Sequence, residues 1–328
     1  MARAWHLVSR PQGVPTKDNF ALEETNLGPV SEGMIRVRNS WLSVDPYMRG
    51  RMNDVKSYVP PFQLGEPMEG GAVGEVIESK ADGFSPGDLV MHMNGWRDEA
   101  LVPSQAARKI PALGATPDMF LGILGVTGAT AYFGLLDAAS AKEGDIVFVS
   151  AAAGAVGSAA VQIAKARGMT VIGSAGGPQK CEFVRSLGAD KIIDYRSEPI
   201  RKSLAAAAPD GIDVYFDNVG GDHLDAALAL ARNNARFAIC GMIANYNDPN
   251  PPTFRFITRI IAARIRLKGF LVFDYQSRMD EFYRDMSQWV ASGAVKSRET
   301  IVDGLENMPD AFLGLFKGEN TGKMLVRL

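Results

Sequence analysis

The residues that point most directly to chemistry form the turn "AAAGAVG" (151–157). Ala152, Gly154 and Gly157 have the spacing of a nucleotide-binding glycine turn, with alanine in place of the first glycine. A β-branched run precedes the turn and an amphipathic helical run (155–168) follows it. Gly154 would let the backbone approach a pyrophosphate, Gly157 would let the helix pack closely on the sheet, and the helix N-terminus would offer free N–H groups. The turn therefore predicts a dinucleotide site, although tight turns also need glycine for purely conformational reasons.

The position that would distinguish the two nicotinamide dinucleotides carries no acid. A carboxylate about twenty residues past such a turn accepts hydrogen bonds from the adenosine ribose of NAD. Here the corresponding stretch (174–177) reads "SAGG". Lys180 opens the next helix and Tyr195 ends the next strand, so both can reach a 2′-phosphate. NADP(H) is the favoured cofactor, and the alternative for Lys180 is a solvated lysine at a helix start.

These residues require a sheet to position them, and the middle of the chain supplies the pattern. Strand-like and helical runs alternate there, which predicts a doubly wound parallel sheet with helices on both faces, an α/β fold. The six predicted strands are 145–150, 170–175, 191–195, 212–219, 235–241 and 266–273. The helical runs are 117–140, 155–168, 179–189, 221–231 and 279–293.

The two ends of the chain follow a different pattern. Residues 1–110 read as short strands broken by turns, with glycines suited to a bent, barrel-like sheet. The tail ends in a predicted strand (322–328) and is too short for a core of its own. We therefore expect the tail to complete the first domain, so that the doubly wound sheet is an insertion between two halves of the other domain.

Composition narrows the class of protein. The chain has 328 residues, 46% of them hydrophobic, with a formal net charge of −2 and two cysteines. This excludes a disulfide framework and argues against a dedicated nucleic-acid or membrane-surface binder. No signal peptide or 18-residue apolar run is visible. A cytoplasmic enzyme acting on a small molecule is the prediction.

The chain resembles the medium-chain dehydrogenase/reductase superfamily over essentially its whole length. It looks most like the zinc-independent alkenal/one double-bond reductases: prostaglandin reductases (leukotriene B4 12-hydroxydehydrogenases), plant double-bond reductases and bacterial curcumin reductases. The stretches that carry the resemblance are "SVDPYMRGRM" (43–52), "TGATAYFGLL" (127–136), "AAAGAVG" (151–157), "FDNVGG" (216–221), "ICGMIANYN" (239–247), "RIRLKGFLVFDYQSRMDEF" (264–282) and "GLENMPDAFLGLFKGENTGK" (304–323).

The resemblance implies a Rossmann six-stranded sheet inserted into a β-rich, GroES-like catalytic domain. The implied boundaries are 1–122 and 293–328 for the catalytic domain and 123–292 for the NADP-binding domain. It also implies homodimers that pair the edge strands of the two cofactor sheets, and "LKGFLV" (267–272) is apolar enough to need such cover.

The resemblance further implies roles for individual residues. The pyrophosphate turn maps onto Ala153, Gly154, Ala155, Val156 and Gly157, and the 2′-phosphate contacts onto Lys180 and Tyr195. The nicotinamide end maps onto Asn218, Cys240, Gly241, Met242, Ile243, Tyr246, Phe270, Leu271, Val272 and Asn320. The alternatives are that Asn218 is a plain turn residue and that Phe270, Leu271 and Val272, placed along the sixth strand, are core residues.

No metal site is expected. The only histidines, His6, His92 and His223, are scattered, and the loops that hold zinc in other members of the superfamily read "VDPYMR" and "GEPMEGG". Hydride delivery to the β-carbon of a conjugated carbonyl needs only a donor for the oxygen, where enolate charge develops. Tyr246 is the first candidate donor and Tyr47 the second. The alternatives are a loop tyrosine that covers the cofactor and a tyrosine that packs the Asp-Pro turn, and water can supply the proton.

The prediction is therefore an NADPH-dependent reductase of the C=C bond of α,β-unsaturated ketones and aldehydes. An apolar mouth at 58–68 would suit hydrophobic enones. An NADPH:quinone oxidoreductase of the same superfamily is the nearest alternative. A non-catalytic NADP(H)-binding redox sensor is a third.

Overall fold

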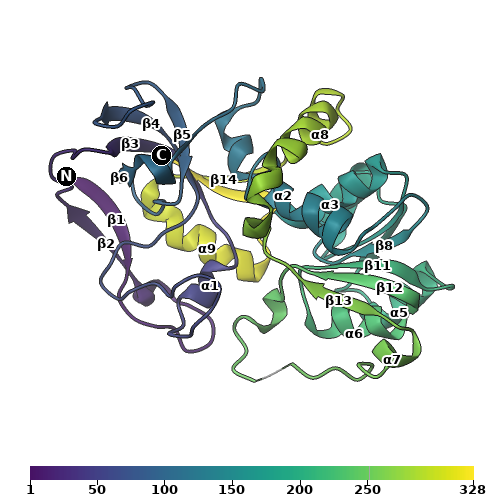
Figure 1. Ribbon diagram of the computed structural model, residues 1–328. Helices are drawn as coiled ribbons and strands as arrows, with labels where there is room; N and C mark the ends of the chain where they lie inside the picture. The colour runs from purple at the N-terminus through teal and green to yellow at the C-terminus, as the bar shows by residue number, and fades with distance from the viewer. Residues whose placement is uncertain (251) are drawn as a thin grey trace. The chain divides into compact units, whose positions relative to one another are not determined.

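A computed structural model describes residues 1–250 and 252–328. The chain forms two compact units, one made of Met1–Leu121 with Glu299–Leu328 and the other of Gly122–Arg298 (Figure 1). The second unit therefore lies, in sequence, between the two segments of the first. Each unit is described separately below.

The Gly122–Arg298 unit is built on the predicted six-stranded sheet. Its strands are β8 (Ile146–Val149), β9 (Thr170–Ala175), β10 (Lys191–Asp194), β11 (Ile212–Asp217), β12 (Ala231–Ile239) and β13 (Arg266–Gly269). The order is β10-β9-β8-β11-β12-β13 and every neighbouring pair is parallel. The prediction of a doubly wound Rossmann sheet is confirmed. Because all strands run in the same direction, the loops after β8, β9, β10, β11 and β12 all lie at the carboxyl ends of the strands.

Helices cover both faces of this sheet. They are α2 (Val126–Phe133), α3 (Ala155–Ala166), α4 (Pro178–Ser186), α5 (Ile200–Ala207), α6 (Gly221–Ala229), α7 (Arg259–Ala262) and α8 (Met279–Ala291). Figure 1 shows α2, α3 and α8 on one face and α5, α6 and α7 on the other. The single helical run predicted at 117–140 is broken into a 3₁₀ turn (Pro117–Leu121), α2 and a π turn (Gly134–Ala138).

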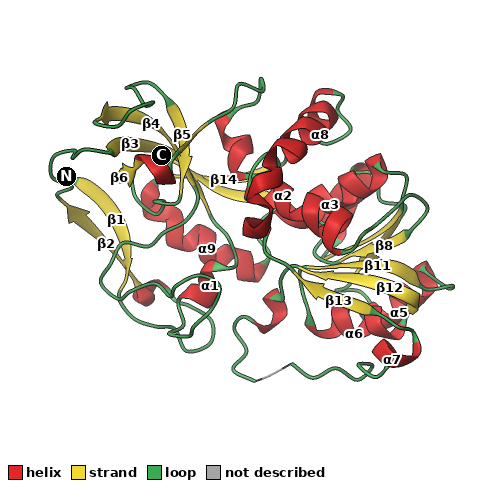
Figure 2. Cartoon of the chain, viewed as in Figure 1, coloured by secondary structure: helices red, strands yellow, loops and turns green. Residues whose placement is uncertain are grey.

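The other unit is β-rich, as expected (Figure 2). A two-stranded sheet pairs β1 (Ala2–Leu7) with β2 (Phe20–Thr25). A seven-stranded sheet contains β3 (Met34–Ser43), β4 (Ala72–Ser79), β5 (Leu89–His92), β6 (Glu99–Pro103), β7 (Arg108–Lys109), β14 (Glu299–Asp303) and β15 (Lys323–Arg327). Strand β15 pairs with β3, so the C-terminal tail does complete this sheet.

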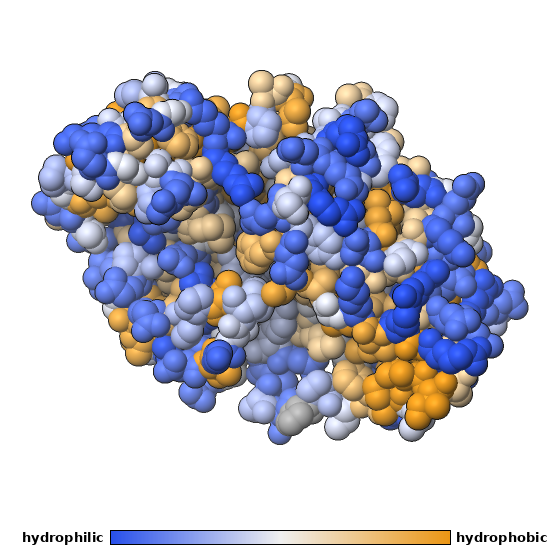
Figure 3. All heavy atoms as spheres, in the orientation of Figure 1, coloured by the Kyte–Doolittle hydropathy of each residue, from blue (hydrophilic) through white to orange (hydrophobic). Residues whose placement is uncertain are grey.

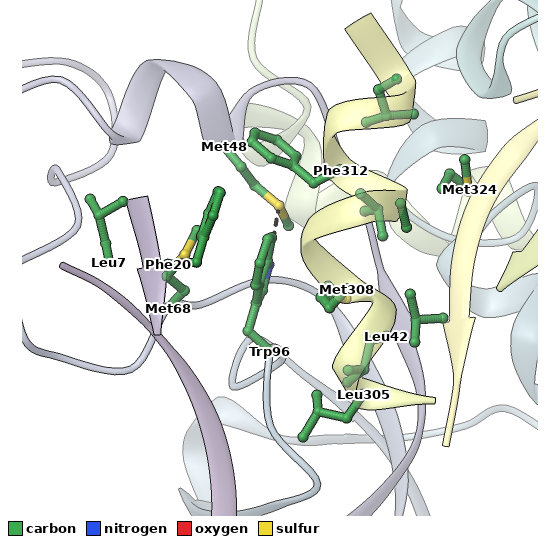
Figure 4. Close-up of a cluster of buried hydrophobic side chains, with 14 of the residues drawn as sticks. Leu7, Phe20, Leu42, Met48, Met68, Trp96, Leu305, Met308, Phe312 and Met324 are labelled. Carbon is green, nitrogen blue, oxygen red and sulfur yellow. Dashed lines mark hydrogen bonds between the residues drawn. The ribbon is translucent and has the colours of Figure 1, made fainter. Parts of the chain in front are cut away.

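Two helices, α1 (Met48–Arg51) and α9 (Met308–Lys317), complete the unit together with an aromatic cluster. Trp96 is fully buried, stacks on Phe20 at 5.7 Å between ring centroids and meets Phe312 of α9 edge-on at 5.8 Å (Figure 4). Its indole N–H donates to Met48 Sδ at 3.4 Å. The cluster thereby fixes α1, and with it Tyr47, which immediately precedes that helix.

Candidate functional site

The glycine turn lies between β8 and α3, as the sequence predicts. Gly154 caps α3 with extended backbone (φ −81°, ψ 176°) and no side chain bonds to the first N–H groups of the helix. A Cβ built on Gly154 would meet only one heavy atom, Ala151 O at 3.2 Å, whereas a Cβ on Gly157 would lie 2.2 Å from the same oxygen. Gly157 is thus required by packing, while the space beside Gly154 is open. An open cradle lined by free helix N–H groups fits a pyrophosphate.

The loop after β9 carries the predicted 2′-phosphate residues. The backbone of Gly176 is covered by side chains, because a Cβ there would lie 2.6 Å from Tyr195 Oη and 3.0 Å from Arg196 Nε. Lys180 lies in the first turn of α4, and burial followed by repulsion from Arg196 lowers its pKa. Neither Lys180 nor Arg196 forms an ion pair with a carboxylate of residues 1–250 or 252–328. Two adjacent cations without a counter-ion fit a phosphate dianion.

Arg196 is a residue that sequence analysis missed. It follows β10 as an ordinary exposed arginine, and only the pairing of Asp194 with Ala175 brings it beside Gly176. One acid also lies nearby. The Asp194 carboxylate accepts hydrogen bonds from the backbone N–H groups of Gly177 at 2.9 Å and of Arg196 at 3.0 Å. These bonds hold the two loops together at this edge of the sheet.

The loop after β11 holds Asn218 by two hydrogen bonds to one residue. The Asn218 backbone N–H donates to Ser150 Oγ at 2.9 Å, and its side-chain amide donates to Ser150 O at 2.8 Å. Ser150 directly follows β8, so Asn218 is tied to the start of the glycine turn. Its side-chain oxygen is left to accept a further hydrogen bond.

The loop after β12 folds Tyr246 back toward the strand end. Its hydroxyl accepts a hydrogen bond from Met242 N–H at 3.4 Å and lies 3.0 Å from the position of a Cβ on Gly241. Ile243 begins a 3₁₀ turn that ends just before Tyr246. Burial, followed by the charge of Asp217, raises the pKa of the Cys240 thiol to about 12. Cys240 is therefore a neutral thiol at ordinary pH.

The placement of Phe270, Leu271 and Val272 along the sixth strand is wrong. Strand β13 ends at Gly269 and Val272 begins a 3₁₀ helix (Val272–Arg278). The Phe270 ring packs edge-on against Phe216, and a Cβ on Gly134 would lie 2.4 Å from its Cζ. Packing of this ring into the core turns the chain away from the sheet edge. The half-buried Phe270 side chain thus packs against Phe216, which leaves its backbone for any cofactor contact.

The β-rich unit carries the remaining two residues, Tyr47 and Asn320. The Tyr47 hydroxyl is buried without a hydrogen-bond partner in the described part of the chain, and burial followed by the charge of Asp45 raises its pKa well above its usual range. The Asn320 side chain donates to Gly322 O at 2.8 Å.

A buried ion pair links the loops of these two residues. Lys323 is 3% exposed, and its ammonium donates to Val44 O and to Asp45 Oδ1, both at 2.8 Å. Asp45 also accepts from the Ser43 hydroxyl. The "VDPY" loop and the "GENTGK" return, distant in sequence, are therefore fixed to each other, which brings the Tyr47 and Asn320 segments into one supporting network.

The structure also locates the three histidines. His6 and His223 are buried, and His92 is buried between Asn39 Oδ1 at 2.9 Å and Asn94 N–H at 3.1 Å. Across residues 1–250 and 252–328 there is no cluster of three or more His, Cys, Asp or Glu side chains that would hold a metal ion. In the same residues, no helix has the length and hydropathy of a bilayer-spanning segment.

Two protein-family profiles match the chain, and together they define an oxidoreductase of two domains. Residues 3–110 match the N-terminal domain of oxidoreductase, and residues 155–292 match the zinc-binding dehydrogenase family. The latter description concerns the family, and the metal-ligand cluster that it suggests is absent from the described residues.

Individual relatives cover nearly the whole chain. The NADPH-dependent curcumin reductase of Escherichia coli is 42% identical, over 99% of this chain and 96% of that protein. The 2-alkenal reductase (NADP(+)-dependent) of Nicotiana tabacum is 39% identical, over 96% and 94%. The crystal structure of CurA from Vibrio vulnificus in complex with NADPH is 43% identical with a TM-score of 0.95, over 99% of this chain and 98% of that one. The chain belongs to the medium-chain dehydrogenase/reductase superfamily, in its NADPH-dependent double-bond reductase branch.

Proposed function

We propose that this protein reduces the C=C bond of α,β-unsaturated ketones and aldehydes with NADPH. The observation that carries the proposal is the similarity, along nearly the full chain, to reductases whose names specify a 2-alkenal and curcumin as substrates and NADP(H) as cofactor. The geometry agrees, because an open glycine cradle and a pair of unpaired cations lie at the strand ends of one sheet.

The Gly122–Arg298 unit is the NADP(H)-binding domain in this proposal. Ala153, Gly154, Ala155, Val156 and Gly157 hold the pyrophosphate through backbone N–H groups and the end of α3. Lys180, Tyr195 and Arg196 hold the 2′-phosphate. The nicotinamide half is held by Asn218, Cys240, Gly241, Met242, Ile243, Tyr246 and the backbone of Phe270, Leu271 and Val272. When bound, the dihydronicotinamide supplies the hydride.

The β-rich unit, Met1–Leu121 with Glu299–Leu328, is the substrate domain in this proposal. The segment 58–68 includes the exposed side chains of Tyr58 and Leu64, as expected for the mouth of a site that admits hydrophobic enones. Beside it, the Arg51 guanidinium lies 4.1 Å from the centre of the Phe62 ring and pairs with Glu69 at 2.6 Å.

Two tyrosines are alternative candidates for the hydrogen-bond donor to the substrate carbonyl oxygen. As negative charge develops on this oxygen, a hydroxyl donor stabilises the enolate without a metal. Tyr246 is the first candidate, because it lies on the loop after β12 and its hydroxyl accepts a long hydrogen bond from Met242 N–H. Tyr47 is the second candidate, because its buried hydroxyl has no partner in the described residues. The raised pKa of Tyr47 keeps its hydroxyl protonated at neutral pH, as a donor must be.

We also propose that the protein is a cytoplasmic homodimer. Strand β13 is one of the two edge strands of the parallel sheet, and all four of its residues are exposed. An apolar area lies over α7 in Figure 3, where Ile261 is 82% exposed. Edge pairing of β13 with a second copy would satisfy the free backbone groups and cover Leu267 beside them. A monomeric mass by light scattering in solution would overturn this.

The test of the function is a substrate panel. Enones, enals and quinones are each mixed with NADPH and, in parallel, with NADH, and the loss of dihydronicotinamide absorbance is followed. We expect turnover of enones and enals with preference for NADPH. Turnover of quinones alone would favour the NADPH:quinone oxidoreductase, and binding of NADPH with no substrate consumed would favour the redox sensor. Tyr246→Phe should lower kcat about 10²- to 10⁴-fold if its hydroxyl is the donor.

A further inference from the structure

One buried carboxylate lies behind three of the strand-end loops. Asp217 is the last residue of β11 and is 0% exposed. Burial raises its pKa, and the hydrogen bonds that it accepts oppose this shift. A buried charge is costly in folding unless donors surround it. Its surroundings therefore indicate what it does.

Four donors converge on a single oxygen of this carboxylate. Oδ1 accepts from the Tyr215 hydroxyl at 2.7 Å, Gly220 N–H at 2.8 Å, Val219 N–H at 2.9 Å and Ser150 Oγ at 3.3 Å. Two of these donors are the backbone amides of the loop that follows Asn218. Oδ2 is buried without a partner in the described residues. The bonding is one-sided and directed at the loop.

The same residue connects the loops on either side. Its backbone oxygen accepts from the N–H groups of Cys240 at 3.0 Å and Gly241 at 3.1 Å, at the start of the Tyr246 loop. Ser150, which bonds Oδ1, begins the glycine turn and also receives both hydrogen bonds from Asn218. The loops after β8, β11 and β12 thus meet at one residue.

We propose that Asp217 is a positioning residue, which sets the geometry of the glycine turn, of Asn218 and of the Tyr246 loop before NADPH binds. This inference rests on the proposed function, since it assumes that these loops receive the cofactor. Asp217 touches no reacting group and acts through the loops alone. Because these loops are already ordered before the cofactor binds, the entropic cost of binding is smaller.

The same strand offers a matched control at its other end. Asp213, near the start of β11, also accepts from a backbone amide, Ile146 N–H at 2.9 Å, and from Arg232 at 3.0 Å. It lies at the amino ends of the strands, away from the cofactor loops. Asp213→Asn and Asp217→Asn therefore remove the same charge from the same strand, and only the second disturbs the proposed positioning.

Asparagine at 217 keeps the shape of the side chain but not its bonding. The amide oxygen can take the place of Oδ1 as a weaker, uncharged acceptor. The amide nitrogen then occupies the position of Oδ2, which is buried and receives no hydrogen bond, so two N–H donors are added at a site that now holds an acceptor. The loop amides of Val219 and Gly220 are expected to loosen.

The first readout needs neither cofactor nor substrate. Backbone hydrogen exchange of the segment 218–222 is measured in the cofactor-free protein for wild type, Asp217→Asn and Asp213→Asn. We expect exchange in Asp217→Asn to be faster by about 10- to 100-fold, as for loss of hydrogen bonds to a charged acceptor. Wild-type exchange in a folded Asp217→Asn protein would overturn the proposal. If enone turnover fails even in wild type, this readout is unaffected, so the two failures are distinguishable.

The second readout is NADPH affinity, followed by cofactor fluorescence and paired with thermal unfolding. Asp217→Asn should weaken binding by about 10- to 100-fold, and Asp213→Asn should leave it unchanged even if its melting temperature falls. Equal loss of affinity in both variants would show a general structural effect and overturn the proposal. Ser150→Ala, which keeps the carboxylate, decides the question if Asp217→Asn does not fold. Ser150→Ala should speed hydrogen exchange of the segment 218–222 and weaken NADPH binding. Wild-type exchange together with wild-type affinity would refute the positioning role proposed for this hydrogen-bond network.

Discussion

Replacing each glycine of the turn by alanine should affect different properties: Gly154→Ala should weaken cofactor binding, and Gly157→Ala should lower the stability of the fold. The Gly154 backbone has ordinary negative φ, and its Cβ would meet only Ala151 O at 3.2 Å. Reduced freedom of the unfolded chain stabilises such a variant by about 0.4–1 kcal/mol, and the loss of a good N-cap residue costs about as much. The free energy of unfolding of Gly154→Ala should therefore change by less than about 1 kcal/mol.

Gly157→Ala should instead lose stability. Its Cβ would lie 2.2 Å from Ala151 O, 2.8 Å from Ala151 C and 2.9 Å from Ala152 Cα, all of them backbone atoms that cannot rotate away. Overpacking of this kind costs about 1–3 kcal/mol. For a domain of this size each kcal/mol lowers Tm by about 2–4 °C. Thermal unfolding of the cofactor-free protein measures the difference between the two variants.

Binding should reverse the order of the two glycines. A methyl group on Gly154 stands where the pyrophosphate approaches the turn, so at least one N–H to phosphate bond is lost. A hydrogen bond to a charged group contributes about 1.5–3 kcal/mol, which corresponds to about 10- to 150-fold in affinity. NADPH and NADH share the pyrophosphate, so fluorescence titration should show the same loss for both. Wild-type affinity in Gly154→Ala would refute the assignment of the cradle, and wild-type Tm in Gly157→Ala would refute the packing argument.

Three further predictions follow from charged and titrating groups. Lys180→Ala and Arg196→Ala should each raise KM for NADPH about 10- to 100-fold and leave KM for NADH within about two-fold; equal losses with both cofactors, in initial-rate assays, would contradict the 2′-phosphate site. Burial lowers the pKa of His92 to about 3 and of His223 to about 4. Only the unfolded chain takes up these protons below about pH 6.5, so each histidine should reduce stability by about 2 kcal/mol at pH 5, a loss that grows toward pH 4; an unchanged Tm between pH 7 and 5, or an unaltered pH slope in His92→Gln, would contradict this. Lys323→Met removes the cation beside the Asp45 carboxylate, whose side chain is 15% exposed, and should cost about 3 kcal/mol in urea unfolding, whereas a loss below about 1 kcal/mol would mean that Asp45 finds another donor.

Much of the cofactor sheet could be predicted because its signals are local. A β-branched run, a glycine turn and an amphipathic helix follow one another within about one βαβ unit, and each signal constrains the next. The strand at 170–175 is observed with the predicted bounds, Thr170–Ala175. Helix α9, by contrast, was not predicted, since its residues stood in a stretch read as mixed elements.

The residues that prediction missed depend on contacts between distant segments. Arg196 has no local pattern, and it acquires a neighbour in Lys180 only when β10 pairs with β9. The run after Gly269 reads as a continuing strand, because β-branched and aromatic residues favour strands. Packing of Phe270 against Phe216 overrides that local preference.

The same limit explains why the supporting charges were not visible in the sequence. Asp217 and Lys323 lie inside the strands predicted at 212–219 and 322–328, and the structure places them as the last residue of β11 and the first of β15. Each is buried, and each costs free energy that an apolar residue would not. What they share is position: Asp217 holds the loops after three strands of the cofactor sheet, and Lys323 holds the Tyr47 segment to the Asn320 segment. Stability alone does not account for charges at these points, since well-packed apolar side chains would serve it as well. Precise placement of site loops does account for them, because hydrogen bonds fix direction where apolar contacts do not.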